Sequence, residues 1–557
     1  MKKIIALILC VILACGLLAG CGSGGSSAPA SSGSSGSSAP AASSGSSGSG
    51  QLVQGSNTQD GGETKVELPV ETAPPEAEYY DEISVYLPDG LPVVSHVNKG
   101  FSGLCVTHIC FMVWDRLIQF VPDSTWNPEL ATEWEMSEDG FECRIKIRDD
   151  VYFHNGEHMT SDDVYFTVME LAKAEENTGT HLQRAWKEVV AMDILGDYEF
   201  VFHLKEANQD FCNKTLTGTT AIILSRKAFA DDPETAPMIG TGPWKITAFE
   251  PMVSLSLERF DDYFGEKALA KTCIMRTVPE QTAKDIMMKN GELTFGEISG
   301  MYVKEYLDLG FNIYQVTNNN CEYLSFNQNK PLMQDKNFRL ACAYAINKQA
   351  IIDVAVDGCG ELPKAIFYGY GTAYRNPDIK PIDYNLELAK EYLAKSSYKG
   401  ETIKLSACID RCIKAAQMVQ EQLMAIGIDV DLNIYDQGGL NQLTGWDNMS
   451  EDLLCHSGAM GSVGTAMDGY TMTGQGNNVA HWSNPEYDEL LIKAKATKDG
   501  PERQALYYKA QEIYADAMPM FTLYHLTQYY ACAPGAGGCI PYPSTYVDWS
   551  HCYRVKQ

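Results

Sequence analysis

A continuous stretch, residues 130–164, constrains the fold of this 557-residue chain more than any other part of the sequence. Its first half has the pattern of a β-hairpin. Trp134 and Met136 lead into a turn at 137–140, where Gly140 can adopt a positive φ. After the turn, charged residues alternate with an apolar set, which predicts a strand with one buried face. That apolar set is Phe141, Cys143, Ile145 and Ile147.

The second half of the stretch predicts a tight turn followed by a helix. Asn155 and Gly156 form a strong two-residue turn signal. Thr160, with Asp163 three residues later, has the spacing of a capping box at a helix start. Apolar residues then recur at helical spacing, which predicts a helix with one buried stripe. The stripe consists of Val164, Val168, Leu171 and Ala172.

The order of these pieces resembles the signature of the family 5 solute-binding proteins of ABC importers, which include dipeptide, oligopeptide and nickel binders. Members typically read P-x-L-A-x-x-W, then S-x-D-G, then R-x-x-V-x-F-H-x-G-x-x-x-x-A-x-D-V. The chain matches at Pro128, Leu130, Ala131, Trp134, Ser137, Asp139, Gly140, Arg148, Val151, Phe153, His154, Gly156, Asp163 and Val164, with Ser161 where Ala is common. The resemblance implies an α/β fold with two lobes and an extra sublobe, the periplasmic-binding-protein-like fold of type II, cluster C.

Further segments extend the resemblance from about residue 79 to about residue 530. Residues 114–118 resemble the family's Y-[DE]-x-L helix, 239–244 resemble V-G-T-G-P-Y, and 339–348 resemble R-x-A-x-x-Y-A-I-D-R. The lobes of this family are discontinuous in sequence. The resemblance therefore implies that lobe I comprises 79–119, 235–315 and 527–557, the extra sublobe 120–234, and lobe II 316–526. The hinge would lie near 314–316 and 523–527.

The first residues have the features of an export signal. Lys2 and Lys3 precede an apolar run, residues 4–18, that is short for a membrane span. The run ends in Leu-Ala-Gly-Cys at 18–21, which resembles the bacterial lipobox. This implies a lipoprotein signal peptide over 1–20 and a lipidated Cys21; an ordinary secretory signal is the alternative. Residues 21–78 begin rich in Ser and Gly, which predicts a disordered tether. We therefore expect a protein anchored by lipid to the cell membrane and facing outward.

Charge and cysteine content narrow the class of protein. The net charge of −29 argues against binding nucleic acid or anionic lipid surfaces. Seventeen cysteines are present, of which fourteen remain outside the signal region and the lipobox. No C-x-x-C pair occurs, and the chain is too large for a disulfide scaffold. Buried thiols are the expected state, although metal-binding or redox roles stay open near Cys408 with Cys412 and Cys532 with Cys539.

One motif suggests a different class, a zinc metallopeptidase. His154, Glu157 and His158 satisfy H-x-x-E-H. That chemistry needs both histidines on one helical face, whereas Asn155-Gly156 within the motif disfavours a helix and the helix cap follows only at Thr160. We therefore favour a strand, a turn and a helix cap. Apart from this motif, the sequence contains no G-x-S-x-G, P-loop or H-E-x-x-H motif, and we expect no enzyme activity.

Three segments supply candidate ligand-binding residues. The first is the loop 96–103 with the tryptophan that follows it. The second is the Gly-rich segment 455–470, which we interpret as a ligand loop because glycines let a ligand approach the backbone. The third, 240–244, is more consistent with a structural turn. The candidates are Phe101, Ser102, Trp114, Ser457, Gly458, Ala459, Met460 and Asp468. Peptide binders of the family often have an amine-pairing Asp early in the second segment, but here the first Asp is Asp468.

Taken with the resemblance, these features predict a monomeric receptor that captures oligopeptides or dipeptides by hinge closure. It would deliver them to the permease and ATPase subunits of an ABC importer, with no cofactor and no bound metal of its own. A nickel chelate, haem or an oligosaccharide is an alternative ligand, since His96, His108 and His456 could suggest a chelate. A ligand-sensing receptor is an alternative role.

Overall fold

The computed structural model describes residues 52–54, 56–60, 63–67, 73–88, 90–99, 101, 104–120, 126–218, 221–364, 374–436, 439–440, 450–459, 463–542 and 547–556. All of them belong to one unit, Gly48–Gln557. The predicted signal peptide, Cys21 and most of the predicted tether lie outside these ranges. The prediction of disorder was wrong for the part of the tether that is described, because β1 (Leu52–Gln54) pairs with β15 (Asn312–Phe326) and β2 (Ser56–Asp60) pairs with β3 (Glu63–Glu67). Among the helices in the described ranges, none combines the length and the apolar character needed to cross a bilayer.

A twelve-stranded mixed sheet runs through most of this unit. Ten strands follow the order β11-β12-β13-β4-β14-β20-β15-β19-β17-β18, and β1 and β16 pair with β15 and β20. Their bounds are β1 Leu52–Gln54, β4 Glu82–Leu87, β11 Trp244–Glu250, β12 Ser254–Arg259, β13 Thr272–Thr277, β14 Phe295–Ile298, β15 Asn312–Phe326, β16 Gly360–Glu361, β17 Ile403–Ala407, β18 Val430–Ile434, β19 Leu453–Ala459 and β20 Met520–Cys532. This arrangement of strands and helices is a mixed α/β fold, as expected from the sequence.

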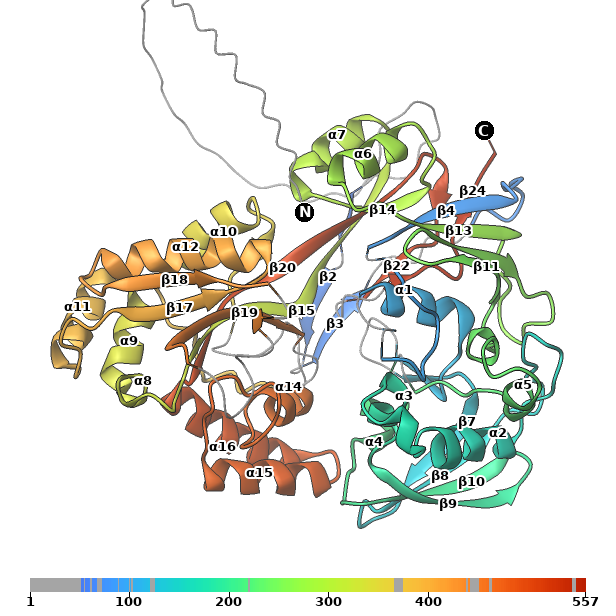
Figure 1. The fold of residues 1–557 in the computed structure, drawn as a ribbon, viewed down its shortest axis with the longest axis horizontal. Helices are drawn as coiled ribbons and strands as arrows, with labels where there is room; N and C mark the ends of the chain where they lie inside the picture. Colours follow the sequence, from blue (N-terminus) through green and yellow to red (C-terminus); the bar gives the residue numbers. More distant parts are fainter. Residues whose placement is uncertain are drawn as a thin grey trace, which may run out of the picture. The chain divides into compact units, whose positions relative to one another are not determined.

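Two long strands, β15 and β20, connect the two halves of this sheet. They run side by side and antiparallel, from Asn312 opposite Cys532 to Ser325 opposite Met520 (Figure 1). At one end β20 pairs with β14, and at the other β15 pairs with β19. Their register shifts between Thr317 and Cys321. A register shift interrupts the regular ladder, so the two strands are not one uniform ribbon.

The hairpin predicted at 130–147 belongs to a separate four-stranded sheet. Its order is β7-β8-β10-β9, with β7 Ala131–Met136, β8 Glu142–Ile147, β9 Val189–Gly196 and β10 Glu199–Leu204. Gly140 has φ +75° in the turn, as predicted. Cys143, Ile145 and Ile147 are buried, but the placement of Phe141 on the buried face was wrong, since it is 43% exposed. Phe141 precedes the first residue of β8 and stays in the turn.

The helix after the hairpin begins as predicted. α2 spans Ser161–Tyr165 and continues as a π-helical segment, Phe166–Leu171. The Thr160 side chain accepts a hydrogen bond from the N–H of Asp162, and the Asp163 carboxylate accepts one from the N–H of Thr160. The capping box is therefore present. Val164, Val168 and Ala172 are fully buried on the stripe.

The sequence also predicts helix caps at Asp335, Asn347 and Asn484, each of which precedes apolar residues at helical spacing, and a helix begins at each of them. Asp335 caps α9 (Lys336–Ala345), Asn347 caps α10 (Lys348–Ala355) and Asn484 caps α15 (Pro485–Ala496) through side-chain oxygens. The predicted helix at 114–118 is absent, because α1 ends at Val113 and residues 118–120 form β5. The remaining main helices are α3 His181–Ala185, α4 Phe211–Lys214, α5 Arg226–Asp231, α6 Gln281–Lys289, α7 Val303–Asp308, α8 Pro331–Gln334, α11 Leu386–Lys395, α12 Asp410–Met424, α14 Val463–Tyr470 and α16 Pro501–Ala517.

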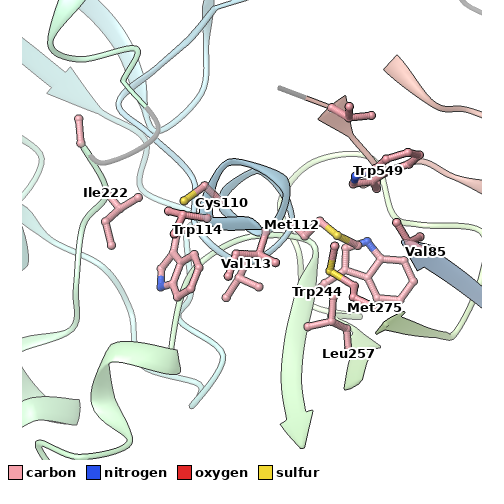
Figure 2. Close-up of a cluster of buried hydrophobic side chains, with 14 of the residues drawn as sticks. Val85, Cys110, Met112, Val113, Trp114, Ile222, Trp244, Leu257, Met275 and Trp549 are labelled. Carbon is pink, nitrogen blue, oxygen red and sulfur yellow. The ribbon is translucent and has the colours of Figure 1, made fainter. Parts of the chain in front are cut away.

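The buried apolar side chains fall into three clusters. The largest draws on 83–316 and 530–552, while the other two draw only on residues between 321 and 524. Figure 2 shows part of the largest cluster, where Trp244 lies near Met275 and Leu257 on one side of α1 and Trp114 lies on the other. Along the chain, the change from the first cluster to the others falls within β15 and again within β20. Most of the apolar side chains on each side of this change therefore pack against residues of the same side, and this burial stabilises each half by itself.

Candidate ligand-binding site

The first predicted ligand segment is packed into the core. Phe101 and Trp114 are 0% and 1% exposed, and both rings make edge contacts with His96 at centroid distances of 4.7 Å. In this structure neither ring is accessible to a solute. The burial therefore gives no support to a ligand contact for either residue, which stays a prediction. Ser102 lies outside the described residues. The sequence could not reveal this burial, since an aromatic residue in a loop is equally compatible with core packing and with stacking on a ligand.

The second predicted segment is more ordered than a loop. Ser457 and Gly458 lie in β19, opposite Glu322 and Cys321 of β15, and the strand continues to Ala459. Met460 lies outside the described residues, and α14 begins at Val463. The interpretation of the whole Gly-rich segment as a loop was therefore wrong. Apolar strand residues before it, Leu453 to Cys455, are buried and extend the sheet into it.

A charged group absent from the predicted set lies beside Ser457. Arg411, in the first turn of α12, donates from Nε to the carboxylate of Glu322 at 2.5 Å and from Nη2 to the Ser457 hydroxyl at 3.0 Å. The Glu322 side chain is fully buried, whereas one third of the Arg411 side chain is exposed. A buried carboxylate thus holds the guanidinium of a side chain that is only partly buried. The polar group formed by Glu322, Arg411 and Ser457 is called the arginine cradle below.

Burial shapes the electrostatics of the arginine cradle. It raises the pKa of Glu322, against the opposing charge of Arg411. Its second oxygen, Oε2, is buried without a hydrogen-bond partner among the described residues. Within the described ranges, Arg411 is the only cation that pairs with Glu322, and its positive charge offsets part of the cost of burying the carboxylate. Glu322 and Arg411 are 89 residues apart, and no local sequence pattern connects them.

Asp468, the acidic residue among the predicted ligand-binding candidates, already has a cation beside it. Its carboxylate lies 3.4 Å from Nζ of Lys214. Burial raises the pKa of Asp468, and the charge of Lys214 opposes that rise. A ligand amine would have to replace Lys214 or share the carboxylate with it. The role predicted for Asp468 in ligand binding stays a prediction.

Asp468 belongs to a larger set of ion pairs that joins two distant parts of the sequence. Lys495 pairs with Glu188 at 3.1 Å, and Arg503 pairs with Asp210. The N–H of Gln209 also donates to the carbonyl of Lys495 at 2.9 Å. The Arg503 side chain is only 4% exposed, so its pair with Asp210 is largely desolvated. The ion-pair face is defined as Glu188, Asp210 and Lys214 on one side and Asp468, Lys495 and Arg503 on the other.

The third predicted segment is a structural turn. A side chain at Gly240 would collide with the carbonyl oxygen of Val113, and one at Gly242 would lie 2.7 Å from the carbonyl oxygen of Met112. Thr241 accepts a hydrogen bond from the N–H of Asp115 through its hydroxyl at 3.3 Å. The two glycines are therefore required by the close approach of this turn to the end of α1.

The H-x-x-E-H motif has no geometry for zinc. Nε2 of His154 lies 2.9 Å from the carbonyl of Gly242, and Nε2 of His158 lies 2.7 Å from the carbonyl of Asp149. Within the described ranges, no cluster of three or more His, Cys, Asp or Glu side chains could hold a metal ion. The motif is a turn flanked by two histidines that bond to backbone.

A shallow hollow of about 440 Å³ lies near this motif. It is lined by Thr132, Ile147, Arg148, Asp149, Asp150 and Tyr198. The guanidinium of Arg148 in this hollow already has a partner, since its Nε and Nη2 donate to the two carboxylate oxygens of Asp150 at 2.5 and 2.9 Å. The hollow therefore offers a ligand no unpaired charge from Arg148, and the arginine cradle is the better candidate site.

Comparison with known proteins places this geometry in context. Residues 125–479 match the family model described as bacterial extracellular solute-binding proteins, family 5 middle. The oligopeptide-binding protein AppA of Bacillus subtilis is 26% identical over 432 residues, which are 71% of this chain and 77% of that protein. Heme-binding protein A of Haemophilus influenzae is 22% identical over 484 residues, 78% of this chain and 85% of that protein.

A solved structure supports the same fold. The ABC transporter substrate-binding protein CtaP of Listeria monocytogenes superposes with a TM-score of 0.76. The match covers 86% of this chain and all of that one, at 24% sequence identity. This similarity identifies the α/β fold of cluster C periplasmic binding proteins.

Proposed function

Because the chain belongs to the family 5 bacterial extracellular solute-binding proteins, the substrate-binding proteins of ABC importers, we propose that its solute is a short peptide. The protein captures the peptide outside the cytoplasm and delivers it to the importer's permease. Lipid on Cys21 anchors it to the membrane, and the segment between Cys21 and β1 acts as the tether. Binding solutes rather than catalysis is the work of this family, so the metallopeptidase interpretation is set aside.

The observation that supports a peptide is the arginine cradle. A guanidinium can bind a carboxylate through two parallel hydrogen bonds. Two of the five N–H groups of Arg411 donate to Glu322 and Ser457, and the side chain is one third exposed, so the proposed ligand carboxylate would accept from the remaining N–H groups. Every peptide with a free C-terminus carries at least one carboxylate, the one at that terminus. Because Glu322 and Ser457 hold the guanidinium in advance, little side-chain entropy is lost when the ligand binds.

Closure about a hinge accounts for capture. The three apolar clusters change within β15 and within β20, and the register of these strands shifts between Thr317 and Cys321. We assign the hinge to these two strands, near 314–316 and 523–527, with lobe I and the sublobe on one side and lobe II on the other. A solute that contacts both sides shifts the equilibrium toward the closed state.

The proposal is tested first by the ligand that co-purifies. Native mass spectrometry of the exported protein, followed by denaturation, should release short peptides. Release of haem, a nickel chelate or an oligosaccharide would overturn the peptide assignment, and the relation to a heme-binding protein makes haem a specific alternative.

The second test addresses the carboxylate. A released peptide and its C-terminal amide are titrated against the wild type, Arg411→Met and Lys414→Met. Lys414 lies one turn along α12, its side chain is 44% exposed, and its one ion pair among the described residues is with Asp410, so it is a matched control for charge. We expect the free peptide to bind Arg411→Met at least tenfold more weakly and Lys414→Met normally. Equal affinity of the wild type for peptide and amide would remove the arginine cradle from the site.

A further inference from the structure

Two cysteines from different elements lie almost in bonding distance. Cys143 is in β8 and Cys212 is in α4, and their Sγ atoms are 3.0 Å apart. Both side chains are buried, at 0% and 4% exposure. A disulfide has an S–S distance of about 2.05 Å. An approach of about 1 Å would therefore join the two thiols.

The surroundings fix both cysteines. Cys143 faces Phe202 across the ladder between β8 and β10. The ring of Phe202 contacts that of Phe211, the neighbour of Cys212, at a centroid distance of 6.0 Å. Both sulfur atoms thus sit in a packed apolar corner, where the main chain of each element is held by its own contacts. Little rearrangement is needed to bring the thiols together.

We propose that Cys143 and Cys212 are joined by a disulfide in the exported protein. The family works outside the cytoplasm, where disulfides form and persist. Each thiol gives up one proton and one electron. The two electrons and two protons pass to the disulfide of a thiol–disulfide exchange protein or a small oxidised thiol, which leaves as two thiols.

The order of events follows from burial. The hydrogen bond to Cys212 and burial raise the pKa of Cys143 well above its usual value. The thiolate is the species that attacks a disulfide, so exchange in the packed protein is slow. The bond therefore forms during folding, before the corner closes, and is afterwards reduced only when unfolding opens the corner.

This bond would act on the ion-pair face. Cys212 lies between Asp210 and Lys214, which pair with Arg503 and Asp468. α4 has only four residues and no side-chain hydrogen bond at its N-cap. A covalent connection to β8 fixes it to the four-stranded sheet and thereby positions both charged side chains for closure.

Peptide mapping tests the bond directly. The exported full-length protein is quenched in acid, alkylated without reductant and digested with trypsin. The bond predicts that peptide 117–144 is linked to peptide 206–214, with a mass two hydrogens below their sum. Reductant before alkylation should separate them. Recovery of both peptides alkylated without reductant would overturn the proposal.

Thermal unfolding supplies a second readout. We expect a strong reductant to lower the unfolding midpoint of the wild type by several degrees. In the double variant Cys143→Ala, Cys212→Ala that reductant-dependent shift should vanish, whereas it should persist in Cys342→Ala, which removes a different buried thiol. A shift that is equally large in the double variant would assign the effect to other cysteines and overturn the proposal.

Discussion

At the scale of single residues, Asp115 is the most unusual titrating group. It is 3% exposed, its Oδ1 accepts from the Tyr263 hydroxyl at 3.1 Å, and its Oδ2 is buried with no partner among the described residues. Burial raises its pKa to about 7, and the nearby charge of Glu129 adds to the rise. The neighbouring Arg116 is engaged by Glu129 at 2.8 Å and compensates only in part.

This environment predicts a pH dependence of stability. The folded protein retains a proton on Asp115 between about pH 4 and pH 7, whereas the unfolded chain releases it. Stability from this group is therefore complete below pH 4 and is lost as the pH rises through 7, by at most about 1.4 kcal/mol per pH unit. Urea unfolding of the wild type and Asp115→Asn at pH 5 and pH 8 measures the loss.

The comparison isolates one group, because both proteins keep every other titrating side chain. We expect the stability of Asp115→Asn relative to the wild type to rise between pH 5 and pH 8. Parallel pH profiles for the two proteins would mean that Asp115 is ionised in the folded state throughout.

At the scale of elements, the capping box at Thr160 stabilises the start of α2, and its contribution to the free energy of unfolding can be measured. Besides capping Thr160 through Oδ2, Asp163 accepts from the N–H of Arg226 through Oδ1 at 3.0 Å, so one carboxylate serves α2 and the start of α5. Thr160→Ala should cost about 1 kcal/mol of unfolding free energy. Asp163→Ala removes two partners and should cost about 2 kcal/mol.

Chemical denaturation measures both, with Asp162→Ala as the control in the same turn. Asp162 pairs with Arg226 at the surface, where an ion pair contributes little. If Asp162→Ala destabilised the protein as much as Asp163→Ala, the capping role assigned to Asp163 would be wrong.

The elements also show how far sequence reasoning reaches. The caps at Thr160, Asp335 and Asn347 and the turn at Gly140 depend on neighbours in sequence, and they were predicted. The arginine cradle depends on β15, α12 and β19 meeting in space, so no local pattern contained it. For the same reason, the strand character of Ser457 to Ala459 was missed. Glycines suggested a loop, but pairing with β15 determined the conformation.

At the scale of the whole molecule, the ion-pair face joins parts of the chain that the hinge would separate. Residues 188–214 lie in the predicted sublobe, and residues 468–503 lie in predicted lobe II. Such contacts exist only when the two sides meet, and they favour the closed state by their own free energy. An exposed pair adds little, whereas the largely buried Arg503 can contribute more.

The last prediction therefore concerns Arg503 and solute affinity. Arg503→Gln removes the charged donor to Asp210, which should cost the closed state about 1.5–3 kcal/mol. Apparent affinity falls in proportion to the closed fraction, so binding should weaken by at least about tenfold. Calorimetric titration with the co-purifying solute measures this. Asp210→Asn is a second variant, in case Arg503→Gln folds poorly.

A matched control comes from an exposed pair that spans the same two parts of the chain. Lys498 lies 3.9 Å from Glu138, with both side chains in solvent. Lys498→Ala should leave affinity within about twofold of the wild type, because screening removes most of such a pair's energy. Small-angle scattering without solute should show a larger radius of gyration for Arg503→Gln than for the wild type, and an unchanged radius for Lys498→Ala. Wild-type affinity in both Arg503→Gln and Asp210→Asn would mean that the ion-pair face does not stabilise the closed state.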